Sequence, residues 1–258
     1  MHATLRQTLM AAAVLGAASF GAPGTLRAET VQLGFILDQS GSISGNDWGI
    51  ITNGLATAIQ NLVPVGGLNI YEITVVKFGT VASVVVAPTL ITSVAVKSAV
   101  AGLISSAIQS GGNTNYTAGL DAMRIAITGS VNFQASGKQY INFATDGAPN
   151  STADNGVVPR NLMIAQGIDN ISIEGIGVTA SGAAFLQNSI CYPGPCDLTV
   201  PYNFPAQGFY IAVANAQGYA SAIGNKILVV TQPVPEPASM AVLGIGLLGL
   251  GALRRFRG

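Results

Sequence analysis

The chain has 258 residues, of which 49% are hydrophobic and only 9% are charged, whereas an average soluble domain has about 25% charged residues. Eleven basic and eleven acidic residues balance, so the composition offers no basic surface for nucleic acid. The single histidine is His2, which leaves no histidine for a Ser-His-Asp or Cys-His catalytic group or for a zinc site.

Residues 1–28 have the layout of a secretory signal peptide. Arg6 precedes an apolar run over 9–20, and Ala28 supplies a small residue at the expected cleavage point. The residues just before Ala28 are unusual for such a point. An N-terminal membrane anchor is the alternative, although the apolar run is short for a full span. We predict cleavage by signal peptidase after Ala28 and export of the remaining chain.

Residues 29–233 form the predicted domain, in which apolar runs typical of strands alternate with segments of helical spacing. The expected strands are Val31–Leu37, Ile70–Phe78, Val81–Val86, Tyr140–Ala144, Ile171–Val178 and Ile227–Val230. The expected helices are Trp48–Leu62, Val94–Ile108, Thr117–Ile127, Pro159–Gly167 and Gln207–Gly224. This alternation predicts an α/β fold with a central, mostly parallel sheet flanked by helices.

Side chains with oxygen atoms gather in three loops beside these elements. Asp38, Ser40 and Ser42 follow the first strand, Thr114 precedes a helix, and Asp146 follows a later strand. In an open α/β sheet, ligands bind beyond the carboxyl ends of the strands. Carboxylate and hydroxyl oxygens suit Mg²⁺, Mn²⁺ or Ca²⁺ and are poor ligands for zinc or copper. Taken singly, each loop is equally an ordinary turn or helix start.

The order and spacing of the three loops resemble the von Willebrand factor A (VWA) family. Its three-layer, Rossmann-like fold carries a metal-ion-dependent adhesion site (MIDAS), and the resemblance extends over about 31–230. It places the family's last helix at Gly208 to Ile223. Gln39 stands where a small or apolar residue is commoner in the family, and we expect its side chain to point away from the metal.

The resemblance also implies a role for each polar residue of the loops. Ser40, Ser42 and Thr114 would contact a divalent cation directly, whereas Asp38 and Asp146 would act mostly through bound water, because Mg²⁺ retains several waters in proteins. An acidic oxygen from a partner would fill the remaining position.

Cys191 and Cys196 enclose the sequence Tyr-Pro-Gly-Pro. In an exported chain with two cysteines, a disulfide that closes this loop is the economical interpretation. Redox-active pairs normally have two intervening residues rather than four. The loop belongs to an insertion after Val178, which is either part of a binding surface or a plain surface loop.

The C-terminal tail over 234–258 has three parts in sequence. Pro235, Glu236 and Pro237 lead into an uncharged apolar run over 238–253, and a basic cluster follows. As a helix, the apolar run spans about 24 Å, short of the roughly 30 Å hydrocarbon core. This order resembles the PEP-CTERM sorting signal of Gram-negative bacteria, which the membrane protease exosortase is thought to cut near Pro-Glu-Pro. It implies transient membrane anchoring, followed by release to the cell surface or extracellular matrix.

Three functions remain open for the domain between leader and tail, which keeps six basic and ten acidic residues for a net charge of −4. The first is a metal-dependent binding or adhesion module whose partner is a protein or an acidic polysaccharide. The second is a metal-assisted hydrolase, although the sequence has no histidine and no further carboxylate pair for acid–base work. The third is a structural matrix protein in which the metal only stiffens the fold.

Overall fold

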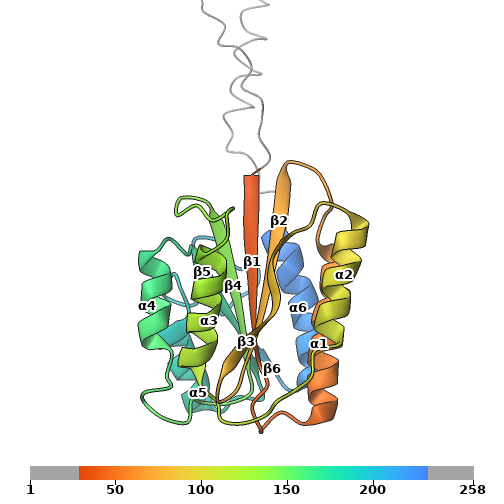
Figure 1. The fold of residues 1–258 in the computed structure, drawn as a ribbon. Helices are drawn as coiled ribbons and strands as arrows, with labels where there is room; N and C mark the ends of the chain where they lie inside the picture. Colours follow the sequence, from red (N-terminus) through yellow and green to blue (C-terminus); the bar gives the residue numbers. More distant parts are fainter. Residues whose placement is uncertain (1–28, 232–258) are drawn as a thin grey trace, which may run out of the picture.

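Six strands form one sheet at the centre of the computed structural model, which describes residues 29–231 (Figure 1). The strands are β1 (Glu29–Asp38), β2 (Asn69–Phe78), β3 (Ala82–Leu90), β4 (Lys138–Thr145), β5 (Asn170–Ile176) and β6 (Tyr210–Val213). Their order in the sheet is β3-β2-β1-β4-β5-β6. Only β3 is antiparallel, because it forms a hairpin with β2, as the Gly79-Thr80 turn between two β-branched runs predicts.

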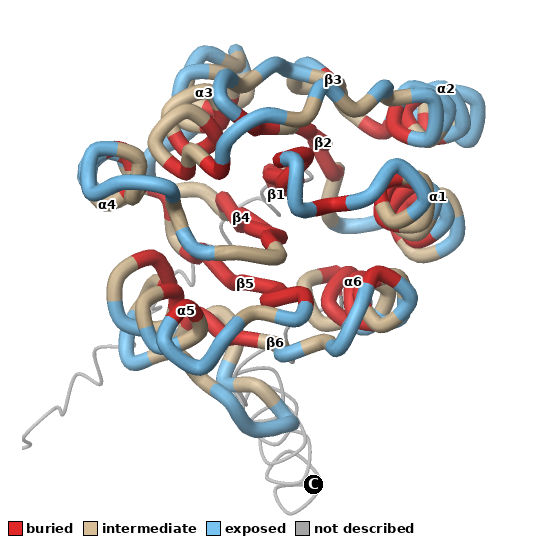
Figure 2. Tube along the Cα trace, turned by 90° about the horizontal axis from the view of Figure 1, so that it is seen from below, coloured by how far each residue is buried: buried red, intermediate tan, exposed pale blue. Residues whose placement is uncertain are grey.

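Helices cover both faces of the sheet, in two groups that are separated in the view of Figure 2. One face carries α1 (Gly45–Leu62), α2 (Val94–Ser105) and α6 (Ala216–Thr231). The other carries α3 (Tyr116–Thr128), α4 (Val157–Ala165) and α5 (Ala180–Phe185), which continues into a π-helical turn at Leu186–Ile190. The predicted fold class, a mostly parallel sheet flanked by helices, is confirmed.

The central strand β1 shows why the core has two halves. Leu33, Phe35 and Leu37 pack into the cluster beneath α1 and α6, whereas Ile36 packs into the cluster beneath α3. Strands that are buried on both faces read as continuous apolar runs, which is why the sequence marks β1 so clearly. Because β1 and β4 are parallel neighbours, the loops that follow them lie side by side at one edge of the sheet.

The C-terminal part of the domain corrects the sequence prediction. Gln207–Gly224 was expected to be a helix and Ile227–Val230 a strand, but β6 occupies Tyr210–Val213 and α6 runs to Thr231. Aromatic and β-branched residues let β6 pair with β5 in parallel. Ile223 and Ile227 then lie one helical turn apart on the buried side of α6, and a short apolar run cannot by itself distinguish a helix from a strand.

Several predictions concern residues outside 29–231. The signal peptide, the sorting motif at Pro235, Glu236 and Pro237, and the apolar run after it lie outside the described residues. Within 29–231, no helix is long and apolar enough to cross a membrane. The domain limits at 29 and 233 therefore stay predictions.

Candidate metal centre

The first loop follows β1 and holds its polar side chains through local hydrogen bonds. One carboxylate oxygen of Asp38, Oδ1, accepts from the Ser40 backbone N–H at 2.8 Å. The Ser40 and Ser42 hydroxyls lie 3.0 Å apart. Ser44 then caps α1 by accepting from the Asp47 N–H, so the loop is fixed at both ends. Asp38 and Ser40 are buried, whereas Ser42 is exposed.

The third loop, which follows β4, joins the first. The Thr145 hydroxyl donates to Asp38 Oδ2 at 2.7 Å, and the Ser42 hydroxyl donates to Asp146 Oδ1 at 2.8 Å. Hydrogen bonds thus connect four of the five predicted site residues to one another or to this neighbouring strand end. The structure brings Asp38, Ser40, Ser42 and Asp146 together, although 104 positions separate Ser42 from Asp146 in the sequence.

The second loop, over 109–115, is fastened to the first by groups that sequence patterns did not reveal. The Gly41 N–H donates to the Gly112 carbonyl at 2.8 Å. The Gln39 side chain accepts from the Ser110 N–H at 2.9 Å, and Gln109 donates to the Ile43 carbonyl at 2.7 Å. The Gln39 side chain therefore points towards the second loop, consistent with the expectation that it points away from the metal.

Thr114 has different hydrogen-bond partners from the other four predicted site residues. Its backbone N–H donates to the Asn150 side chain, and its carbonyl accepts from the Asn150 N–H at 3.1 Å. Its hydroxyl makes no hydrogen bond to another described residue. The cap of α3 is Asn115, which accepts from Ala118 N–H at 2.9 Å, so Thr114 does not serve as the helix start. Asn150 was missed in the sequence because a lone asparagine in a loop gives no signal.

The electrostatics of the loops favour a cation. Burial raises the pKa of Asp38 from 3.8 to about 6, and burial also raises the pKa of Asp146. Within residues 29–231, neither carboxylate forms an ion pair with a lysine or arginine. Two carboxylates that lack a protein cation, next to hydroxyl oxygens, form a donor set that suits a hard divalent ion. No group of three or more His, Cys, Asp or Glu side chains among the described residues is placed to hold a metal, so this candidate site depends on hydroxyl oxygens as well as on its two carboxylates.

Aromatic rings pack between the sheet and α3, beneath these loops. Phe78 and Phe143 stack at 5.4 Å between ring centroids, and Tyr116 meets Phe143 edge-on at 4.8 Å. The Tyr116 hydroxyl also donates to the Gly147 carbonyl of the third loop. The start of α3 is therefore packed against the strand ends, between the second and third loops.

Residues 32–199 match the von Willebrand factor type A domain. The chain belongs to this family. Residues 233–255 of the VWA chain match the PEP-CTERM protein-sorting motif, which indicates export and sorting to the cell surface. No curated protein matches the chain in sequence.

Solved structures share the fold of this VWA domain at low sequence identity. Proximal thread matrix protein 1 from the mussel byssus, with a zinc-occupied MIDAS motif, has a TM-score of 0.61 at 16% identity, over 79% of this chain and 48% of that one. The pilus adhesin SpaC from Lactobacillus rhamnosus GG has 0.59 at 15%, over 79% and 31%. Manganese-loaded Plasmodium vivax TRAP protein has 0.51 at 18%, over 78% and 74%. The VWA chain thus spans about half of the mussel protein and less of the adhesin.

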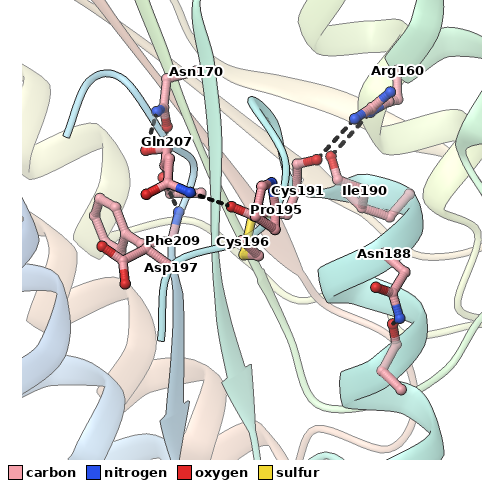
Figure 3. The surroundings of a disulfide bond; sticks show 12 residues. Arg160, Asn170, Asn188, Ile190, Cys191, Pro195, Cys196, Asp197, Gln207 and Phe209 are labelled. Atoms are coloured by element: carbon pink, nitrogen blue, oxygen red, sulfur yellow. Dashed lines mark hydrogen bonds between the residues drawn. A yellow bond between two sulfur atoms is a disulfide. The ribbon is translucent and has the colours of Figure 1, made fainter. Parts of the chain in front are cut away.

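Figure 3 shows the surroundings of the disulfide in the VWA domain. Cys191 and Cys196 are joined, and Arg160 of α4 donates to the Cys191 carbonyl at 2.8 Å. Ile171 and Tyr192 exchange backbone hydrogen bonds of 2.7 and 3.0 Å, which fasten the loop to the start of β5. The metal loops follow strand ends at the opposite edge of the sheet, so the disulfide loop contributes no ligand. A binding role for this insertion stays a prediction.

Gly79, in the turn between β2 and β3, makes a close contact with the second loop. A methyl group on it would lie 2.2 Å from the Gly111 carbonyl oxygen, so the loop that carries Thr114 must move in Gly79→Ala. We expect a loss of about 1–3 kcal/mol in the free energy of unfolding and weaker Mn²⁺ binding, measured by urea denaturation and calorimetry. Gly49→Ala, where nothing lies within 4 Å in helix α1, should stabilise by up to about 1 kcal/mol and leave Mn²⁺ binding unchanged. Equal behaviour of the two variants would contradict this account.

Proposed function

We propose that this protein is an exported, metal-dependent binding module of the bacterial surface or extracellular matrix. The observation that carries the proposal is the meeting of carboxylate and hydroxyl oxygens of the first and third loops at one edge of the sheet. Within residues 29–231, no lysine or arginine pairs with Asp38 or Asp146, and the second loop is hydrogen-bonded to the first. Membership of the VWA family and the PEP-CTERM motif support it.

The ligands that we propose are the five residues of the predicted MIDAS. Ser40, Ser42 and Thr114 would bind Mg²⁺, or Mn²⁺ or Ca²⁺, through their hydroxyls, and Asp38 and Asp146 would neutralise its charge, mostly through water. The cation would supply a concentrated positive charge for an acidic group of the partner. The hydroxyl of Thr114, which has no described hydrogen-bond partner, is available for a state in which that group is bound.

The partner that we propose is a protein or an acidic polysaccharide of the matrix. Because the domain has a net charge of −4, it has no general attraction for acidic ligands, and recognition must come from the local charge of the site. Both carboxylates of the cluster serve the cation, which leaves neither for acid–base chemistry, so the proposed role is non-enzymatic. Signal peptidase and exosortase would process the two ends in a Gram-negative host, with the tail anchoring the chain only transiently.

Retention on matrix prepared from the producing cells tests this function. We expect the wild-type chain to bind in Mg²⁺ and to be released by a chelator, because the acidic group of the partner needs the cation. Thr114→Ala should reduce retention at least tenfold while Mn²⁺ affinity, measured by calorimetry, falls less. Ser42→Ala should weaken both, because Ser42 hydrogen-bonds within the cluster in the absence of a partner.

Asp121→Asn is the matched control, since Asp121 pairs with Arg124 on the surface of α3. It should behave like the wild type in both measurements. Retention that persists in chelator would instead favour the structural matrix role, and equal retention of Thr114→Ala and wild type would remove the second loop from the site.

A further inference from the structure

Three buried polar side chains meet between the sheet and helix α6, on the face away from α3. Asn142 lies in the middle of β4, Glu174 lies on the adjacent strand β5, and Lys226 projects from α6. Their exposed fractions are 2%, 0% and 4%. Fully buried charges are rare in proteins and are normally paired and hydrogen-bonded, so this cluster requires an explanation that the metal centre does not provide.

The contacts place an amine against a carboxamide. Lys226 Nζ lies 2.6 Å from Asn142 Oδ1 and 3.2 Å from Glu174 Oε1. A carbonyl bond is about 1.23 Å long, so the Asn142 carbonyl carbon is at most about 3.8 Å from the Lys226 nitrogen. The nitrogen also lies 4.9 Å from the centroid of the Phe209 ring.

As separate side chains, the three residues leave buried polar atoms unsatisfied. Asn142 Nδ2 and both carboxylate oxygens of Glu174 make no well-directed hydrogen bond among the described residues, although Lys226 and Asn142 both lie close enough to stabilise the charge of Glu174. Native proteins satisfy nearly all such atoms. If Asn142 lost its amino group and Lys226 its charge, two of the buried groups that are costly to keep away from water would be removed.

We infer that Lys226 and Asn142 react to form an intramolecular amide bond between α6 and β4, with Glu174 as the group that holds and moves the proton. The Lys226 nitrogen attacks the Asn142 carbonyl carbon, and a C–N bond forms. The bond from that carbon to Nδ2 breaks, and Nδ2 leaves as ammonia with a proton that Glu174 relays from Nζ. Amine and carboxamide give amide and ammonia, so the step needs no oxidant, reductant or second substrate.

The surroundings provide the protonation states that this step needs. Burial lowers the pKa of Lys226 to about 8 and raises the pKa of Glu174, so a proton can pass from the ammonium to the carboxylate and leave a nucleophilic neutral amine. A protonated Glu174 can then donate to the developing charge on the Asn142 oxygen, in a site where such donors act strongly.

The cavities on the two sides of the cluster differ greatly in size. The space on the sheet side, lined by Phe35, Tyr140, Asn142 and Lys226, measures only about 10 Å³, which is at the lower limit for one water molecule. A larger cavity of about 680 Å³, between α6 and the segment over 200–204, also reaches Lys226. It gives ammonia an exit without exposing the carbonyl carbon of Asn142 on the sheet side.

The bond would tie the last helix to the sheet, across 84 positions of sequence. The PEP-CTERM motif begins two residues after α6, so any pull on an anchored tail reaches the domain through this helix. A covalent link from α6 to β4 would pass that load to the sheet at Lys226, so only the last turn of α6, over 227–231, would lie between the tail and the link. The role of the bond in carrying load rests on the proposed anchoring of the tail. Formation of the bond does not depend on the proposed metal function.

Peptide mass spectrometry of the denatured, trypsin-treated full chain tests the inference. The bond blocks cleavage after Lys226 and leaves that peptide attached to residues 139–160, with a mass about 17 Da below the sum of the two because ammonia is lost. Cleavage after Lys97 serves as the internal control, because this second buried lysine donates only to the Val63 carbonyl. A digest with normal cleavage after Lys226 and a free 139–160 peptide overturns the inference.

Glu174→Gln tests the proton carrier with little change in shape. We expect this variant to fold but to yield at least tenfold less of the branched peptide. Glu72→Gln is the matched control, since Glu72 is equally buried, on β2, where it accepts from Gln32 and Ser130. It should form the branched peptide as the wild type does. Undiminished branching in Glu174→Gln would overturn the role of Glu174.

Discussion

Asp38→Asn should stabilise the metal-free protein and abolish its response to metal. Burial raises the pKa of Asp38 from 3.8 to about 6, so holding this carboxylate ionised at pH 7.5 costs about 3 kcal/mol of folding free energy. Asparagine keeps the shape and removes the charge. Its oxygen can accept from the Ser40 N–H, and Thr145 can donate to the Gly147 carbonyl, 3.2 Å away.

Thermal melting with and without millimolar Mg²⁺ or Mn²⁺ measures both effects. We expect Asp38→Asn to melt several degrees above the metal-free wild type, whereas only the wild type should gain stability when metal is added. Asp121→Asn, on the surface of α3, should reproduce the wild type in both conditions. A variant that melts lower without metal, or that still responds to metal, would contradict the assignment of Asp38.

The affinity for metal should fall at low pH, and the pKa of Asp38 determines the pH at which this fall begins. A proton must leave this carboxyl before a cation binds, so the observed Mn²⁺ affinity should be nearly constant above pH 7. It should be about fourfold weaker at pH 5.5 and about tenfold weaker at pH 5. The raised pKa of Asp146 adds to the loss in the same direction. Calorimetric titration in buffers of different ionisation enthalpy also counts the protons released, and a flat profile from pH 7.5 to 5 would exclude this mechanism.

The same pKa predicts the opposite trend for the stability of the metal-free fold. When the pKa of a carboxyl is higher in the folded than in the unfolded state, the free energy of unfolding falls as the pH rises between the two values, here from about 4 to 6. The stability difference between Asp38→Asn and the wild type should therefore be complete above about pH 6.5 and close towards pH 4. Urea denaturation in chelator at these pH values follows the difference, and subtraction of the two proteins cancels other titrating groups.

The sequence indicates which residues of the candidate metal centre lie near one another only in part. Asp38, Ser40 and Ser42 are close in the chain and follow a strand that is apolar on both faces, so their proximity could be expected. Asp146 joins them only because β4 lies next to β1 in the sheet. The loop contacts of Gln39 and Asn150 leave no pattern in the chain, since each is a single amide side chain whose partner lies 36 or more positions away.

The C-terminal region shows where local pattern fails for the fold. Tyr210–Val213 and Ile227–Val230 are both short apolar runs, yet one is a strand and the other lies in a helix. Pairing with β5 selects the extended form for the first. The second is helical because Ile223 and Ile227 both pack against the sheet at helical spacing. Tertiary contacts outweigh local propensity in such segments.

By itself, the sequence determined the alternation of strands and helices, the oxygen-rich loops and the sorting signal, because each depends on residues within a few positions of one another. Only the tertiary structure decided that Asn115 rather than Thr114 caps α3 and that Lys226 meets Asn142 and Glu174. Hydrogen bonds and ion contacts form between atoms a few ångströms apart. Which distant residues come that close is set by the order of strands and the packing of helices, not by spacing along the chain.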